Sequence, residues 1–248
     1  MFTRAFAVIL AVLIPSPAQV TERIFHLTHA ETASSLQNAV TVIRSVGGIR
    51  HVSLDPERKS VTVRGTADEL RLADWLVAAL DRPGTVPPDF WLLGAADDRF
   101  RVFHLTEDQT ERDLQEMATL IRALADARHV YSYLATKALV VRGSAWRISL
   151  AEWLVGELNQ PANTPPPAGP REFRLQGGSD ILPAEDVIVR IFYTRARTPE
   201  ELGRALTGMR SAVTSLPRSS ILTARGAVVV RASAEKIAAA EQALRQTQ

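Results

Sequence analysis

The sequence predicts an α+β protein built from three tandem βαββα modules. Three observations lead to this prediction: a long internal repeat, the same order of strand and helix patterns in each copy, and two proline-rich joints between copies. Residues 24–83 return as residues 102–161 without a gap, with about 25 of roughly 60 positions identical. A third, divergent copy covers residues 191–244. A module of about 60 residues has only marginal stability by itself, so the repeat indicates that the modules stack against one another in a row.

The element order is clearest in the first copy. A strand, a helix, two strands and a second helix are predicted at residues 24–28, 32–46, 50–54, 60–64 and 66–83. The first helix keeps its apolar residues on one face and is stopped by Gly47 and Gly48. Thr66 and Glu69 have the spacing of a capping box at the start of the second helix. The order of each module is therefore βαββα.

The second copy repeats this order, and the third opens its first helix with a strong cap. Thr198 precedes Pro199 and two acidic residues, which suit the first turn and the positive end of a helix. In the strand at residues 60–64, Val61 and Val63 point one way while Thr62 and Arg64 point the other. We therefore expect a small three-stranded mixed sheet in each module, with both helices on one face and a polar opposite face.

That polar face holds the candidate partner-binding residues. They are His26, Thr28, Arg64, His104, Thr106, Arg142 and Arg231. One charged position, occupied by Arg64, Arg142 and Arg231, recurs in all three modules. Because arginine offers a fork of donors, the three could bind a partner's carboxylates or backbone. Alternatively, each arginine pairs with an acid of its own module.

The proline-rich joints at residues 83–88 and 161–170 are expected to be stiff, extended spacers. A short similar segment follows each joint: Phe90 to Gly94 after the first is matched by Phe173 to Gly177 after the second. We interpret it as an added strand that docks each later module against its predecessor, although chance agreement is the alternative. The predicted units are residues 1–18, 20–84, 87–161 and 171–247, the first being a signal peptide and the others the three modules with their linker strands.

The N-terminus has the pattern of an export signal. Arg4 supplies the positive charge, residues 5–14 are apolar, and small residues at 16–18 suit cleavage near Ala18. A membrane anchor is the alternative, but an apolar run of about ten residues falls short of the roughly 20 that span a bilayer. With no cysteine there is neither a lipid attachment thiol nor a disulfide. We expect a periplasmic or secreted protein without a transmembrane segment in the mature chain.

No pattern in the sequence indicates catalysis. Four of the five histidines occupy two repeated positions, His26 with His104 and His51 with His129. The third copy has Tyr193 and Arg218 there, so each histidine is expected to serve its own sheet rather than a metal. There is no cysteine nucleophile, no Gly-x-Ser-x-Gly motif and no phosphate-binding glycine loop before a helix. We therefore predict no catalytic residue, no metal, no cofactor and no enzymatic activity.

Two repeated tryptophans, Trp75 and Trp153, lie in the second helix of their modules. Packing in the core or between modules is the favoured interpretation, and ligand stacking the alternative.

The quoted patterns resemble a known family. They are a strand with Phe-x-Leu, a Leu- and Ile-rich helix, a strand ending in Val-Arg-Gly, and a helix ending in Trp-Leu-Val-x-x-Leu-Asp-x-Pro, at residues 25–27, 36–44, 61–65 and 72–83. They are similar to the periplasmic N-terminal domains of secretins, the ring-forming channels of type II and III secretion and pilus assembly. The resemblance covers the first two copies well and the third poorly. It implies a KH-like βαββα fold and binding of other protein subunits. A secretin continues into a barrel domain that this sequence lacks, so we expect the protein not to form the channel itself.

The leading functional hypothesis is an exported, non-enzymatic scaffold or adaptor for envelope assembly or secretion. It would act on protein partners, or by self-association, through sheet edges and helix faces. Nucleic-acid binding is disfavoured, because no module has the Gly-x-x-Gly loop of KH domains and the net charge is only +2, before Arg4 leaves with the signal. Binding of cell-wall carbohydrate by the polar sheet face stays open.

Overall fold

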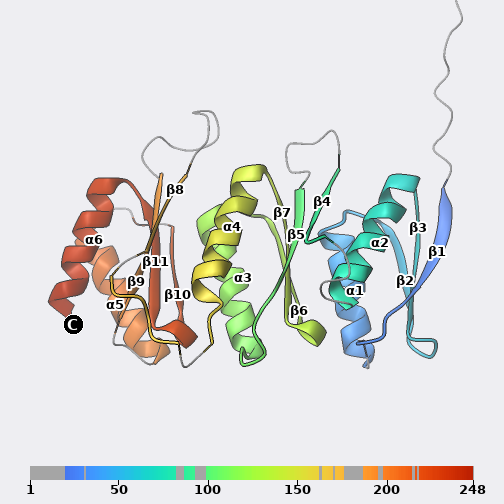
Figure 1. Ribbon diagram of the computed structural model, residues 1–248, viewed down its shortest axis with the longest axis horizontal. Helices are drawn as coiled ribbons and strands as arrows, with labels where there is room; N and C mark the ends of the chain where they lie inside the picture. Colours follow the sequence, from blue (N-terminus) through green and yellow to red (C-terminus); the bar gives the residue numbers. More distant parts are fainter. Residues whose placement is uncertain are drawn as a thin grey trace, which may run out of the picture.

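A computed structural model gives the structure of the chain in ten segments. It describes residues 20–30, 32–81, 87–92, 99–161, 164–169, 171–175, 187–194, 198–213, 216 and 218–247. The predicted signal peptide, residues 83–86 of the first proline-rich joint and residues 162, 163 and 170 of the second lie outside these residues. Within them, three small sheets and six α-helices form a row in which each sheet is followed by a pair of helices (Figure 1).

Module 1 has the predicted order of elements. Its strands and helices are β1 (Thr21–His26), α1 (Ala33–Ser45), β2 (His51–Asp55), β3 (Ser60–Gly65) and α2 (Ala67–Asp81). Thr66 and Glu69 do form a capping box: the Glu69 carboxylate accepts from the Thr66 amide at 2.7 Å, and the Thr66 hydroxyl accepts from the Glu69 amide at 3.3 Å.

Modules 2 and 3 repeat this order with one strand more. Module 2 contains β4 (Asp89–Trp91), β5 (Arg99–His104), α3 (Glu111–Ala125), β6 (His129–Tyr133), β7 (Ala138–Gly143) and α4 (Ala145–Leu158). Module 3 contains β8 (Arg171–Arg174), β9 (Ile188–Tyr193), α5 (Pro199–Ala212), β10 (Ser219–Leu222), β11 (Ala227–Ala232) and α6 (Ala234–Thr247). A short 3₁₀ turn precedes the central strand in both, at Leu134–Thr136 and Thr223–Arg225. The cap predicted at Thr198 is present, since its hydroxyl accepts from the Glu201 amide.

The sheets are wholly antiparallel, so the prediction of mixed sheets is wrong. The strand orders are β1-β3-β2, β4-β5-β7-β6 and β8-β9-β11-β10, and every neighbouring pair among the described strands runs antiparallel. The reason lies in the crossover through α1. It joins β1 to β2, which run parallel to each other, but the later strand β3 inserts between them. The two parallel strands therefore never pair. Modules 2 and 3 also have four strands rather than three, because β4 and β8 extend their sheets.

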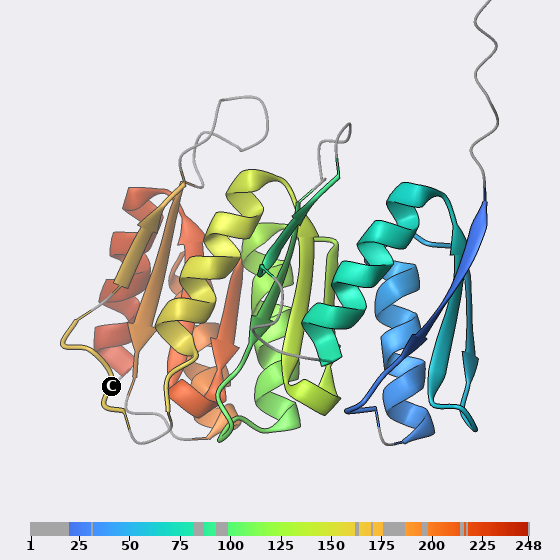
Figure 2. The same ribbon diagram turned by 45° about the vertical axis from the view of Figure 1, so that its right-hand side comes forward.

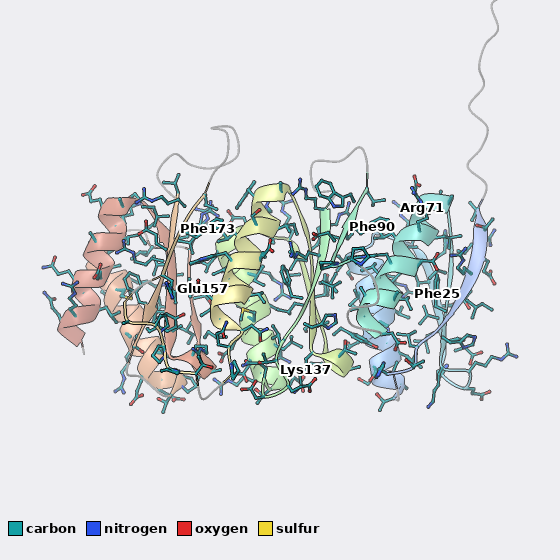
Figure 3. All side chains as sticks on the ribbon, in the orientation of Figure 1. Phe25, Arg71, Phe90, Lys137, Glu157 and Phe173 are labelled. Carbon is teal, nitrogen blue, oxygen red and sulfur yellow. The ribbon has the colours of Figure 1, made fainter. Side chains whose placement is uncertain are left out.

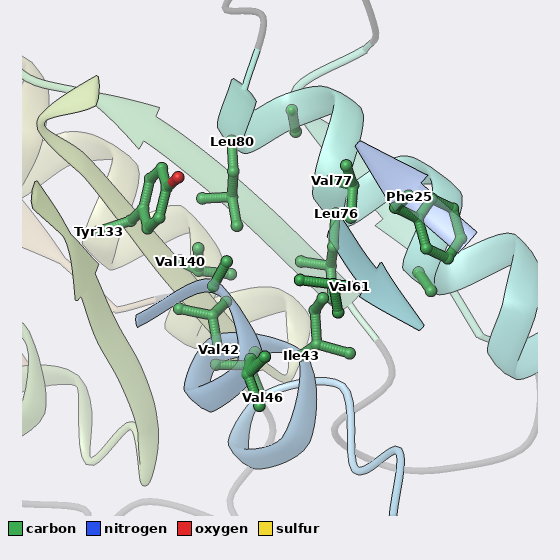
Figure 4. Packing of buried hydrophobic residues seen from close by; sticks show 14 of the residues in the cluster. Phe25, Val42, Ile43, Val46, Val61, Leu76, Val77, Leu80, Tyr133 and Val140 are labelled. Carbon is green, nitrogen blue, oxygen red and sulfur yellow. The ribbon is translucent and has the colours of Figure 1, made fainter. Parts of the chain in front are cut away.

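The core consists of three buried clusters, two of which cross a module boundary. Figure 2 shows that the helix pairs of modules 1 and 2 each lie between two sheets. One buried cluster combines the core of module 1 with residues from the second sheet, among them Phe100, Tyr133 and Val140. Figure 4 shows Tyr133 and Val140 facing Val42 and Leu80 of module 1. A second cluster joins the helices of module 2 to the third sheet in the same way. Each later sheet therefore packs one face on its own helices and the other on the preceding module.

A buried carboxylate ties the two ends of module 1 together. Asp81, the last residue of α2, is 2% exposed and accepts from the Thr28 amide, the Thr28 hydroxyl and the His29 amide at 2.9, 2.7 and 2.8 Å. Burial by itself raises the pKa of Asp81, but donation from His29 and Thr28 outweighs it, and the pKa lies below its ordinary value. In module 2, Asn159 has the same role and accepts from the Thr106 amide at 2.9 Å.

We expect Asp81→Asn to reduce the loss of stability in acid. Because the folded pKa is lowered, the carboxylate stabilises the fold at neutral pH, and this contribution disappears as pH falls from about 4 through the folded pKa. Urea unfolding from pH 7 to pH 3 should show a shallower decline for Asp81→Asn than for the wild type. Asp68→Asn, at an exposed carboxylate, is the matched control. Equal declines for Asp81→Asn and the wild type would contradict the assignment.

Candidate functional site

The repeated arginine does not form a ladder on an open face. Arg142 Nη1 donates to the Val46 carbonyl at 3.1 Å, just beyond the end of α1 in module 1. Arg231 is fully buried and donates to the Leu124 carbonyl of α3 at 2.7 Å and to Asp126 Oδ2 at 3.0 Å. Both arginines therefore satisfy carbonyls at a helix C-terminus of the preceding module, where a positive charge is also favourable. None of these contacts is the alternative pairing with an acid of the same module, since Val46, Leu124 and Asp126 all belong to the preceding module.

The other candidates of module 2 also face module 1. His104 Nε2 lies 3.1 Å from the Ala79 carbonyl, near the end of α2. Beside it, the Thr136 hydroxyl donates to the Leu80 carbonyl at 2.7 Å. Thr106 and its counterpart Thr28 follow their strands and bond to the end of the second helix of their own modules, so neither belongs to a sheet face.

The prediction of an open polar sheet face therefore holds for module 1 alone. We call this surface the free sheet face and define it by the residues Glu22, Ile24, His26, His51, Ser53, Thr62 and Arg64. Within the described residues no other module packs on it, and it lies at one end of the row of modules (Figure 3). His26 and Arg64 are exposed there, whereas Arg142 is half-buried and Arg231 is buried. The candidate set thus splits into one open surface and two internal joints.

A hollow on the free sheet face gathers basic side chains. Its volume is about 330 Å³, and it is lined by Glu22, Arg44, Arg50, His51, Val52, Ser53, Thr62 and Arg64. Arg44 is held in place, because it donates to the carbonyl of Val52. Arg50 and Arg64 have no hydrogen bond or ion pair to any described residue, and Glu22 is the one acid of the lining. The hollow offers free guanidinium groups to a ligand that carries carboxylates or carbonyls.

At the opposite end of the row, the helix pair α5 and α6 differs from the other two helix pairs in the residues at its outer surface. Val42 in α1 and Leu120 in α3 are buried in clusters that include the next sheet, and the matching residue in α5 is Gly208. Likewise, Trp153 packs on Phe173 at 5.3 Å between ring centroids, whereas the matching residue in α6 is Gln242, which is exposed. The last helix pair has thus lost the apolar residues that bind a following sheet, as is typical of a terminal repeat.

Sequence reasoning had a signal for this arrangement but did not use it. Positions that are polar on the free sheet face are apolar in module 2: Phe100 stands for Glu22, and Val140 for Thr62. A change from polar to apolar at matched positions indicates a covered face. A second repeated arginine, Arg23 with its two equivalents, was also overlooked. The tryptophans behave as expected, since Trp75 packs between modules 1 and 2 against Phe90 at 5.4 Å.

The described residues contain no cluster of three or more His, Cys, Asp or Glu side chains placed to hold a metal ion. In the same part of the chain, no helix has the length and apolar character needed to cross a membrane.

No protein-family model and no curated protein matches the chain. Among solved structures, it aligns with the N-terminal domain of the secretin XcpQ from Pseudomonas aeruginosa at 12% identity and a TM-score of 0.25, over 58% of this chain and 64% of that one. A further match is ExeD of Aeromonas hydrophila, at 15% identity and a TM-score of 0.21, over 92% of this chain and 41% of that one. The type II secretion system secretin GspD of E. coli K12 matches at 12% identity and a TM-score of 0.22, over 92% of this chain and 39% of that one.

These solved structures are secretins, the family that the sequence resembles, and each aligns with a TM-score of 0.25 or lower. The chain also spans less than two thirds of the XcpQ chain that it matches.

Proposed function

We propose that the protein is an exported, non-enzymatic scaffold or adaptor that binds a protein subunit of a secretion-related envelope assembly through the free sheet face. One observation carries this proposal. Of the three sheets, the first alone leaves one face uncovered by a neighbouring module within the described residues. The other end of the row, formed by α5 and α6, lacks the apolar residues that join modules elsewhere.

The chemistry of the surface favours a protein partner. Its hollow combines guanidinium donors from Arg50 and Arg64 with an acid, an imidazole and hydroxyl groups, a mixture that suits a polar protein surface. The matching arginines in modules 2 and 3 show what this position binds inside the chain, namely the carbonyls at the end of a helix. Arg64 is free to make the same contact with another protein.

The export signal predicted at residues 1–18 and the secretin resemblance together support a place in the bacterial envelope. In that setting the protein would act outside the cytoplasm, on another subunit or on a second copy of itself.

The test is a crosslinking experiment in the cell envelope. With the photoreactive residue p-benzoylphenylalanine in place of Ser53, which is exposed and lines the hollow, we expect adducts with a foreign protein. Arg64→Glu in the same chain should lower their yield at least tenfold, because it reverses the charge that meets the partner. The mass of each adduct distinguishes a foreign subunit from a second copy.

The matched control places the same photoreactive residue at Gln242, which is exposed on the closing helix pair at the other end. Equal adduct yields from the two positions, or yields from position 53 that do not respond to Arg64→Glu, would overturn the proposal.

A further inference from the structure

A cluster of three charged residues fixes the edge of the second sheet. Arg101 in β5 donates to both carboxylate oxygens of Glu152 in α4, each at 2.8 Å. Its second partner is Asp89 in the added strand β4, at 3.5 Å. Asp89 stands directly opposite Arg101 in the antiparallel ladder. One arginine therefore joins the interior strand β5, the helix α4 and the added strand β4, which forms the edge of the sheet.

Module 3 contains the same cluster with different acids. Arg190 in β9 donates to Glu241 in α6 at 2.9 Å and, through Nε, to Glu172 in the added strand β8 at 3.1 Å. Glu172 again stands directly opposite the arginine in the antiparallel ladder. In both added strands the acid is followed by phenylalanine, Phe90 in one and Phe173 in the other. The register and chemistry of the added strand are thus conserved between two divergent modules.

In module 1 this cluster is incomplete. Arg23 in β1 pairs with Asp74 in α2, which matches the helix acids of the other modules. No described strand lies beside β1, which is an edge of its sheet, and no acid stands opposite Arg23 there. The side chain of Arg23 is 51% exposed, against 19% for Arg101 and 22% for Arg190. An open edge of this kind presents unpaired backbone groups that can bind another strand.

We infer that the free edge of β1 accepts an extended segment of a partner protein as an antiparallel strand, with an acidic residue opposite Arg23. This inference rests on the proposed binding function and names the element, the register and the chemistry of the contact. Backbone hydrogen bonds along β1 would supply affinity, and the Arg23 guanidinium, already oriented by Asp74, would select the acid.

The chain itself does not provide this acid from its N-terminal side. Residues 1–19, which precede β1, contain no aspartate or glutamate. The strands β4 and β8, which do carry an acid, are already paired with β5 and β9.

A second copy is also a poor occupant. Two β1 strands that pair antiparallel about a two-fold axis place side chains from the same sheet face opposite each other. Glu22 and Arg23 are adjacent and point to opposite faces, so no register of this symmetric pairing puts Glu22 opposite Arg23. Two of the registers instead place Arg23 against Arg23 or Glu22 against Glu22, which is unfavourable. The occupant is therefore an acidic, extended segment of a different protein.

The probe is a fluorescein-labelled synthetic peptide with the sequence of residues 87–92, which includes Asp89 and Phe90. Its fluorescence anisotropy is titrated with the mature full-length protein from residue 19. We expect binding that weakens at least tenfold when lysine replaces the aspartate of the peptide. Arg23→Asp should have the same effect on the original peptide and should restore binding of the lysine peptide. This exchange of charges separates a direct contact from misfolding.

Hydrogen exchange gives the second readout, because the amides of β1 should become protected when the peptide binds. Arg58→Glu, at an arginine in the exposed turn after β2, is the matched control and should leave binding unchanged. The inference is overturned if binding ignores the charge at position 23, if β1 amides stay unprotected, or if light scattering shows that copies of the protein pair through β1. In each case, crosslinking from Ser53 still decides whether the free sheet face binds a partner.

Discussion

Replacing Trp75 with alanine is expected to destabilise the protein by about 3–5 kcal/mol. The indole is 7% exposed, and its ring packs against Phe90 at 5.4 Å and against Phe100 at 6.5 Å between centroids. Its Nε1 donates to the Pro87 carbonyl at 2.8 Å. Alanine would leave a cavity between α2 and the second sheet and would free that carbonyl. The joint between modules 1 and 2 should therefore weaken most.

Guanidinium unfolding, followed by far-ultraviolet circular dichroism, measures this effect. The single transition of the wild type should broaden or divide in Trp75→Ala as module 1 separates from the rest. Trp91→Ala is the matched control, since Trp91 is 56% exposed and contacts Arg99 at the surface. It should lower the free energy of unfolding by less than about 1 kcal/mol. Similar losses for the two variants would show that Trp75 does not join the modules.

The second large effect is expected for Arg231→Met, at about 3 kcal/mol. Methionine keeps much of the apolar stem but leaves the Leu124 carbonyl without its donor and removes one of the partners of Asp126. An unpaired buried carbonyl is unfavourable, because it has lost water without gaining a partner.

Arg64→Met is an internal control for this change, because Arg64 occupies the same repeat position and is exposed, with no other described module packed against it. Its effect on the free energy of unfolding should stay within about 0.5 kcal/mol, as is usual at an exposed site. Urea unfolding of the two variants gives the comparison. A loss at Arg64 as large as that at Arg231 would mean that the arginine stabilises its own module rather than the joint.

Local features of the fold were predictable because they depend on neighbours in the sequence. The cap at Thr66 follows from spacing, and the apolar face of α1 from helical period. The antiparallel order of the sheets was harder, because it depends on β3 inserting between two strands that are distant in the chain. The burial of Arg231 was even more difficult to predict from the sequence. An arginine at the end of a strand looks solvent-exposed unless the helix end that it contacts, in another module, is known.

The candidate site shows the same division. The polar alternation of β1 and β3 predicted an outward face, and module 1 has one. Whether a face is open depends on stacking between modules, which the pattern of a single module does not reveal. Comparing equivalent positions across the repeat would have separated the open face from the covered ones, since Glu22 and Phe100 differ so clearly.

The two ends of the row differ from its interior, and this restricts the kind of assembly that copies of the protein can build. Stacking end to end would set Glu22 and Thr62 of one copy against Gly208 and Gln242 of the next, a joint with little apolar area to hold it. End-to-end stacking of the described modules is therefore unfavourable. Copies of the protein that associate would instead meet along the sides of the row.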